Sequence, residues 1–330
     1  MTLSGNPAFA KFLETYGIIV VVLVLMAFLT WSEPQYFLSP ENLSNIVKQN
    51  ASAALLSLGM FVVIVTAGID LSVGSIMALS MVSLAILDKS YGWPWYVVIF
   101  VGPLIGVACG WVNGIGLTWL KLPHPFIMTL GTLNVARGLT NLVTNAAPVS
   151  GLQPQVRYAG QKVYGLGIFD APAGVPVSLI IVAFGAIGLW FFLSRTNVGR
   201  HIYAIGGNPQ AARVSGITVD RVLTYVYMIC GFFAGVAGLL LAGRTDSGFP
   251  NAGIGSELDA IAAVIIGGAS FFGGRGNVGG VLAGVLIIGL MRNGLNLNNV
   301  SVFWQQILIG VVIIGAVYID VLRRRAAVRS

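Results

Sequence analysis

Charged residues are scarce in this chain. Asp, Glu, Lys and Arg make up 9% of its 330 residues and hydrophobic residues 56%, whereas about a quarter of an ordinary soluble domain is charged. A chain of this composition cannot cover itself with polar surface in water, which excludes a soluble globular fold. The alternation of an outer-membrane β-barrel is also missing, and the apolar runs are too long for one. The sequence therefore predicts an all-α, polytopic integral membrane protein with a single transmembrane domain over residues 1–330.

Residues that carry reactive chemistry are equally few. The two cysteines, Cys109 and Cys230, fall in apolar stretches, which excludes a disulfide framework. The two histidines, His124 and His201, do not have the spacing of metal ligands. The phosphate-binding pattern Gly-x-x-x-x-Gly-Lys followed by Ser or Thr does not occur, and no nucleophile stands with a base. We therefore predict no catalytic residue, no cofactor and no metal site in this chain.

Ten membrane spans fit the sequence, with both termini in the cytoplasm. The spans cover approximately residues 17–31, 46–67, 71–87, 97–117, 125–144, 177–193, 223–242, 260–272, 278–291 and 303–321. Basic residues are more frequent on the predicted inner side, as the positive-inside rule requires, so the net charge of +7 does not indicate nucleic acid. Residues 145–176, rich in Gly and Pro, are expected to form a periplasmic loop, and residues 194–222 a cytoplasmic loop.

The predicted cytoplasmic loop contains a short helix whose ends can be identified. Asn208 suits the N-cap, Pro209 the first helical position and Gly216 the left-handed residue after the end. Small side chains lie on one side of this helix at helical spacing: Ala211, Ala212 and Ser215. Such a helix at a membrane surface can dock into a groove on another protein. It can equally be an ordinary connector between two spans.

The predicted span over residues 125–144 has a polar side. One broad arc of this helix carries Thr129, Thr132, Asn134, Arg137, Thr140, Asn141 and Thr144. Unsatisfied polar groups cannot face hydrocarbon, because each one costs several kcal/mol there. The stripe therefore either lines a path for a polyhydroxylated solute or bonds this helix to its neighbours. Arg137 favours the path, since a charge at mid-span is costly and usually functional.

Two glycine-rich stretches separate neighbouring spans. In residues 68–75 we expect Asp70 to be the N-cap of the next helix. The alternative is a broken helix whose freed backbone groups, beside Asp70 and Ser72, meet solute. Residues 267–276 lack the lysine of a phosphate-binding loop, so their glycines are expected to serve close packing and a tight turn. Acidic residues are nearly missing from the predicted mid-membrane positions, since Asp70 and Asp259 lie at span edges.

Four stretches resemble the permease subunits of bacterial ABC sugar importers, the ribose, xylose, arabinose and galactose group. They are TAGIDLSVGS (66–75), KLPHPFIMTLGTLNVARGL (121–139), GRHIYAIGGNPQAARVSGI (199–217) and ELDAIAAVIIGGASFFGGRGNVGG (257–280). The resemblance runs through nearly the whole chain in the same order. It implies a bacterial inner-membrane permease, without enzyme activity of its own, that works as a dimer with a second copy or a paralogue.

The resemblance also implies partners and site residues. Two ATP-binding cassette subunits would bind ATP and Mg beneath the permease, and a periplasmic sugar-binding protein would deliver a monosaccharide. A cytoplasmic loop docks on the ATPase in such importers, and the matching residues here are Gly206, Gly207, Asn208, Ala211, Ala212, Gly216 and Ile217. The candidate translocation path then comprises Asp70, Ser72, Thr129, Thr132, Asn134, Arg137 and Asn141. An ion-coupled secondary sugar transporter is the alternative, and the identity of the sugar stays open.

Overall fold

Helices form nearly all of the structure. The computed structural model describes residues 7–122, 124–163 and 174–329. Its α-helices are α1 (Pro7–Ser32), α2 (Pro40–Val65), α3 (Val73–Lys89), α4 (Trp95–Trp119), α5 (Pro125–Thr144), α6 (Pro154–Arg157), α7 (Val177–Arg195), α8 (Asn197–Gly207), α9 (Pro209–Val214), α10 (Val219–Thr245), α11 (Ser256–Ile266), α12 (Val278–Leu297) and α13 (Val302–Arg329). The prediction of an all-α protein is confirmed.

The strands are short pairs in connecting segments. Strand β1 (Val149–Ser150) pairs antiparallel with β4 (Ser247–Gly248), with Val149 opposite Gly248. Strand β2 (Lys162–Val163) pairs antiparallel with β3 (Val175–Pro176), with Lys162 opposite Pro176. Helix α6 and the 3-10 helix η1 (Tyr158–Gly160) lie between β1 and β2 in the sequence, and η1 contacts α10. The predicted loop over 145–176 thus has local structure, although its residues 164–173 lie outside the described part.

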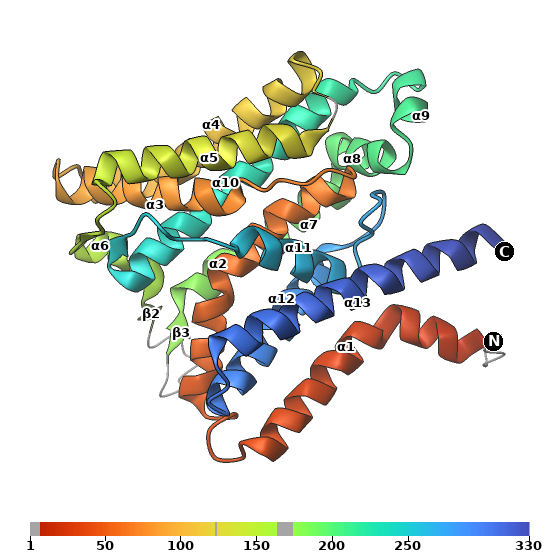
Figure 1. Cartoon of the computed structure of the whole chain (residues 1–330), viewed down its shortest axis with the longest axis horizontal. Coiled ribbons are helices and arrows are strands. Elements are labelled where there is room, and N and C mark those ends of the chain that lie inside the picture. Colours follow the sequence, from red (N-terminus) through yellow and green to blue (C-terminus); the bar gives the residue numbers. More distant parts are fainter. Residues whose placement is uncertain (1–6, 123, 164–173, 330) are drawn as a thin grey trace.

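The two ends of the bundle carry different elements (Figure 1). Helix α1 begins and α13 ends on the right of that view, on the side that also bears α8 and α9. Helix α6 and strands β2 and β3 lie on the opposite side. We call these the α9 side and the α6 side. The described ends of the chain thus lie on the same side as α8 and α9, and the cytoplasmic orientation of both termini stays a prediction.

Ten of the helices correspond to the ten predicted spans, but they are not equally suited to crossing a membrane. By length and apolar composition, five described helices qualify as candidate spans: α2, α4, α7, α10 and α12. Helices α1 and α13 contain shorter apolar parts, Gly17–Ser32 and Val302–Tyr318. The count of ten crossings therefore stays a prediction.

The predicted span over 260–272 is wrong as a continuous helix. Helix α11 has 11 residues and ends at Ile266, so it is about 16 Å long, roughly half of a 30 Å hydrocarbon core. Gly268 follows with φ +84°, and Gly273 and Gly274 also have positive φ. These left-handed residues end the helix and turn the chain before α12 begins at Val278. The apolar residues after Ile266 belong to this turn, in which Ala269 is buried and Phe272 is 43% exposed.

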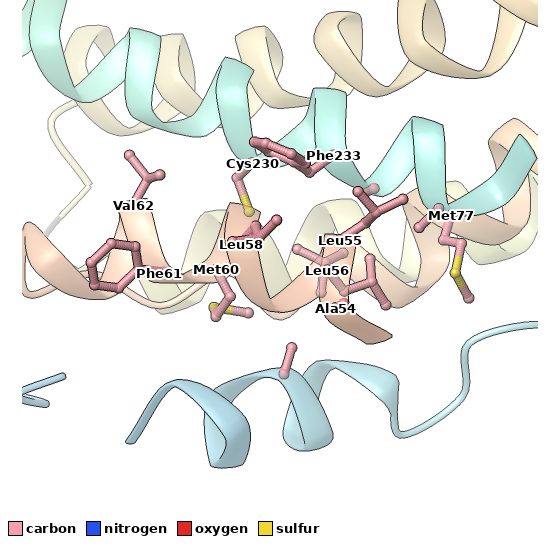
Figure 2. Packing of buried hydrophobic residues seen from close by; sticks show 14 of the residues in the cluster. Ala54, Leu55, Leu56, Leu58, Met60, Phe61, Val62, Met77, Cys230 and Phe233 are labelled. Atoms are coloured by element: carbon pink, nitrogen blue, oxygen red, sulfur yellow. The ribbon is translucent and has the colours of Figure 1, made fainter. Parts of the chain in front are cut away.

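Helix α2 is the central helix of the bundle. From Ala54 to Val65 every residue is buried, which is the pattern of a helix surrounded by protein on all sides. Figure 2 shows its side chains packed beneath Cys230 and Phe233 of α10. Both cysteines are free, as predicted, and Cys230 is part of this core.

A seam of glycines joins α4 to α10. The glycines of α4 recur at every fourth position along the contact: Gly102, Gly106, Gly110 and Gly114. Gly106 faces Gly231 of α10, and a Cβ atom on either residue would overlap the backbone of the other. Because the side chain of glycine is a single hydrogen atom, the two backbones can touch. Such close packing is how helices associate in lipid, where no hydrophobic force drives them together. The high glycine content of the chain thus serves helix packing here.

We predict that Gly106→Leu destabilises the protein by about 3 kcal/mol or more, since overpacking against a rigid backbone cannot relax. The matched control is Gly188→Leu on α7, where a new Cβ meets nothing within 4 Å and the expected change is within about 0.5 kcal/mol. Thermal unfolding of the purified variants in detergent, followed by circular dichroism, measures the difference. Equal midpoints for the two variants would contradict the packing role of the seam.

Candidate functional site

Two broken helices meet inside the bundle. The linker of residues 66–72 turns back from the end of α2 before α3 begins, and the linker of residues 246–255 turns back from the end of α10 before α11 begins (Figure 1). A Cβ atom on Gly253, which has φ +70°, would lie 2.6 Å from the carbonyl oxygen of Gly74. Only glycine lets the second linker touch the first turn of α3 in this way. The same tripeptide, Ala-Gly-Ile, stands in both linkers, at 67–69 and 252–254.

Asp70 lies at the centre of a buried polar network. Its Oδ1 accepts hydrogen bonds from the backbone N–H of Ser72 (2.9 Å) and from the Ser72 hydroxyl (2.5 Å). Asn113 of α4 donates its amide to the Ser72 hydroxyl at 2.9 Å. The Thr132 hydroxyl of α5 donates to Oδ1 of Asn113 at 2.5 Å. The nearby Tyr227 hydroxyl is buried and has no hydrogen-bond partner among the described residues. The network joins α3, α4 and α5.

The structure corrects one expectation about Asp70. The N-cap residue of α3 is Ser72, and the helix starts at Val73, because the Asp70 carboxylate holds Ser72 in the linker and delays the first turn. Asp70 also lies within the bundle and is fully buried. Asn113 stands about 9 Å from the end of α4, and Thr132 about 10 Å from the start of α5. Asp70, in the linker between α2 and α3, is therefore about two turns from the α9-side ends of α4 and α5, and its depth in the membrane stays a prediction.

Sequence reasoning missed Asn113 altogether. It is 1% exposed and is the residue that connects Asp70 and Ser72 to the predicted residue Thr132. The signal was a lone amide in an otherwise apolar span, next to Gly114. An amide at that position has to find a partner inside the protein. The partner could not be identified without the packing of α4 against α3.

The polar arc of α5 divides into two sets. Thr129 and Thr140 are buried and bond to carbonyls of their own helix, at 3.4 Å to Phe126 and 2.6 Å to Ala136. Asn134 is exposed and donates to Leu130 of the same helix at 2.9 Å, while Asn141 is half-buried. Thr132 and Arg137 bond to other elements. The single polar face expected from the periodicity is thus not one surface in this chain.

Arg137 fastens α5 to the second break. Its guanidinium donates to the carbonyl oxygens of Pro250 (2.5 Å) and Ala252 (2.8 Å), both in the 246–255 linker. The carboxylate of Glu257, at the start of α11, lies close enough to interact with its charge. A broken helix exposes carbonyls that need donors. Arg137 supplies them.

The segment between α7 and α10 contains two helices, of which only the second was predicted. Helix α8 begins at Asn197, and its N-cap is Thr196, whose hydroxyl accepts a hydrogen bond from the N–H of Gly199 at 3.0 Å. This cap was readable in the sequence as a threonine three residues before a glycine. We missed it because the glycines and the basic residues of this stretch indicated a loop.

Helix α9 has the predicted ends. The Asn208 side chain accepts from the N–H groups of Gln210 and Ala211, both at 3.0 Å, Pro209 is the first residue, and Gly216 has φ +84°. The small residues do not share one environment. Ala211 is exposed, whereas Ala212 is 4% exposed and packs on the core. Among the other predicted docking residues Gly206 is buried, Ile217 is half-buried, and Gly207, Asn208 and Gly216 are exposed.

Comparison with known proteins identifies the family. Residues 42–317 match the family model described as the branched-chain amino acid transport system permease component. The chain belongs to this permease family. It is 43% identical over 291 residues to the ribose import permease of Bacillus subtilis, covering 88% of this chain and 87% of the relative. It is 39% identical over 312 residues to the D-allose transport system permease of Escherichia coli, covering 94% and 93%. No solved structure matches the chain.

A backbone junction connects α8 of the permease to the first break. Gly274 donates its N–H to the carbonyl of Val65, the last residue of α2, at 2.8 Å. Gly206 of α8 packs against the same carbonyl, so closely that no Cβ atom would fit. Tyr203 donates its hydroxyl to the carbonyl of Gly276 at 3.0 Å, and burial raises the pKa of this phenol, which keeps it protonated. The turn of residues 267–276, which we call the glycine turn, thus serves close packing, as predicted.

The same glycine turn also reaches the last helix. The carboxylate of Asp320 in α13 accepts from the Ser270 hydroxyl and from the N–H of Phe271, both at 3.2 Å. The turn therefore contacts α2, α8 and α13 on the α9 side. A displacement of α8 would be passed directly to the end of α2 and to the linker that carries Asp70.

We predict that Asn113→Ala destabilises the permease by about 2–3 kcal/mol, because Thr132 and Ser72 both lose a buried partner. Asn134→Ala is the matched control, since Asn134 is exposed and bonds only within α5, and its expected cost is within about 0.5 kcal/mol. Thermal unfolding in detergent measures both variants. A neutral Asn113→Ala would mean that the network contributes nothing to folding.

Proposed function

We propose that this permease is the membrane-spanning subunit of a binding-protein-dependent ABC importer in the bacterial inner membrane. It carries a monosaccharide into the cytoplasm, and separate ATP-binding cassette subunits hydrolyse ATP with Mg. The observation that carries this proposal is the similarity to sugar permeases along nearly the whole chain. It extends to the xylose transport system permease of Escherichia coli, at 34% identity over 95% of this chain. The family description names branched-chain amino acids, but the relatives named here carry sugar names, so a sugar is the better-supported solute.

The α9 side is the cytoplasmic side in this proposal, and α9 is the helix that docks on the ATPase. Exposed groups of α9 fit that role: Ala211 presents a small side chain, and Val214 is 90% exposed. A docked ATPase would push on α8 and α9 together, since they share Asn208 as cap residue of both helices. Through Gly206 and Val65 the movement reaches the 66–72 linker, and through Asn113 it reaches α5. This route couples nucleotide-driven closure to the bundle interior.

The solute path in this proposal runs past the two breaks and α5. Asp70 and Ser72 are buried in the conformation described here, so they would meet solute only after the bundle opens. Asn134 is the exposed member of the predicted set, while Thr132, Arg137 and Asn141 are half-buried. A second copy of the chain, or a paralogue, would enclose the exposed face of α5, and a periplasmic binding protein would deliver the sugar on the α6 side.

We predict that Ala211→Glu abolishes uptake while the permease still inserts and folds. A charge left unpaired in a protein interface costs about 2–5 kcal/mol, which corresponds to a loss of more than tenfold in affinity for the ATPase. Uptake of labelled sugar by cells that express the complete importer measures the effect. The control is Ala147→Glu, an exposed alanine on the α6 side, which should leave uptake intact. Normal uptake by Ala211→Glu with an intact complex would reject the docking role.

An ion-coupled secondary sugar transporter remains the second candidate, because the structure places carboxylates inside the bundle. Asp70 has no basic side chain among its hydrogen-bond partners in the described residues. Such unpaired intramembrane acids are common in proton- and sodium-coupled carriers. The two candidates differ in their energy source, which is ATP hydrolysis by a partner subunit for the ABC importer and an ion gradient for the secondary transporter.

Reconstitution separates the two candidates. Proteoliposomes that contain only this permease are expected to show no uphill sugar uptake under a proton or sodium gradient, because the proposal assigns the energy to a partner ATPase. Uptake of labelled ribose, xylose, galactose and allose is measured with and without the gradient. Liposomes that also contain the ATPase and the binding protein, with ATP inside, are the positive control. Gradient-driven accumulation by the permease alone would overturn the ABC assignment.

A further inference from the structure

A cavity of about 520 Å³ opens on the α6 side of the molecule, between α2, α10 and α12. Pockets that bind small ligands measure about 300–1,000 Å³, so this cavity can hold a ligand group. Three basic side chains line it, Lys48, Arg244 and Arg292, together with five side-chain amides. None of the described residues that line it is acidic or aromatic. The cavity lies apart from the Asp70 network and from α9, and the proposed transport function does not use it.

The cavity has more positive charge than the described residues neutralise. Arg292 donates to both carboxylate oxygens of Asp259, each at 2.8 Å. Lys48 and Arg244 form no ion pair with any described residue, and Arg244 donates only to the backbone carbonyls of Lys48 (3.3 Å) and Gln49 (3.2 Å). Lys162 is close enough to Lys48 for their like charges to repel. A bound anion would remove this repulsion.

The amides add donors next to these charges. The side chains of Asn45 and Gln49 make no hydrogen bond with any other described residue, although both line the cavity. Ammonium, guanidinium and amide N–H groups together form the donor set that binds oxyanions, and arginine in particular binds phosphate through two parallel hydrogen bonds. The described lining contains no aromatic residue that could stack on a sugar ring, which makes a neutral sugar a poorer fit.

The depth of the cavity fits a lipid headgroup as well as a soluble anion. Arg244 is the next-to-last residue of α10, and Lys48 lies about 12 Å from the start of α2. The headgroup region extends roughly 5–8 Å beyond each side of the hydrocarbon core. If the helix ends lie at the membrane surface, Arg244 reaches the headgroup region and Lys48 lies about two helical turns deeper in the membrane. They are also exceptions to the positive-inside bias, since Lys48, Arg244 and Arg292 all belong to the side predicted to be external.

We propose that this cavity is a phosphate-binding site. Lys48 and Arg244 bind the phosphate oxygens by charge-assisted hydrogen bonds, and Asn45 and Gln49 supply neutral donors. The phosphate belongs either to a phospholipid of the leaflet on the α6 side or to a soluble phosphate. Arg292, which also lines the cavity, stays paired with Asp259.

Calorimetric titration of the purified full-length chain in a neutral detergent tests the site. One arm uses inorganic phosphate, and the other uses short-chain phosphatidylglycerol, both at constant ionic strength set with sodium chloride. At least one probe is expected to bind saturably. Lys48→Gln should weaken that binding about tenfold or more, because a charge-assisted hydrogen bond is lost. Lys48→Arg keeps the charge and should keep the binding.

The matched control is Lys89→Gln, which removes an exposed lysine from the α6 end of α3, away from the cavity lining, and should leave binding unchanged. Binding of phosphatidylglycerol alone assigns the site to a lipid headgroup, binding of phosphate alone assigns it to a soluble anion, and binding of both assigns it to the phosphate group itself. The proposal is overturned if neither probe saturates, or if Lys89→Gln weakens binding as much as Lys48→Gln. Transport activity is not part of this readout, so failure here leaves the importer assignment untouched.

Discussion

Hydrocarbon does not solvate polar groups, so every broken helix in this bundle must find its hydrogen-bond partners within the protein. The two breaks meet this requirement in different ways. Asp70 folds its own linker by accepting from Ser72, and Asn113 completes the bonds from α4. Arg137 of α5 reaches across to the carbonyls of Pro250 and Ala252. Both solutions tie a break to α4 or α5, so the breaks can move only if those helices move with them.

The glycines make these ties possible because they bring backbones into contact. Gly74, in the first turn of α3, touches Gly253 of the second linker, and Gly106 touches Gly231 in the seam between α4 and α10. At the α9 side, Gly206 and Gly274 bring α8 and the glycine turn onto the last carbonyl of α2. Backbone contacts transmit displacement with little loss, since no flexible side chain lies between the elements. Backbone contacts thus connect α8 to the last residue of α2, five positions before Asp70.

Much of the architecture was predictable from residue types. The apolar runs indicated an all-helical membrane protein, and Asn208, Pro209 and Gly216 located both ends of α9, since caps and left-handed residues are local chemistry. The break after α2 was one of two open interpretations of residues 68–75. The short α11 was missed because apolar runs do not reveal where a packed turn replaces a helix. The polar residues of α5 were predicted correctly, but they do not form one surface. Helical periodicity cannot show which neighbouring element covers each part of a helix.

The sequence by itself determined the class of the protein and the capped helix on the α9 side, because these depend on composition and on residues close together in the chain. Tertiary structure alone decided which polar residues meet. Asp70 and Asn113 are 43 positions apart, and Lys48 and Arg244 are 196 apart. Their proximity follows from how α3 packs against α4 and how α2 packs against α10 and α12, and that packing is set by backbone contact at glycines, which no local pattern of hydrophobicity records.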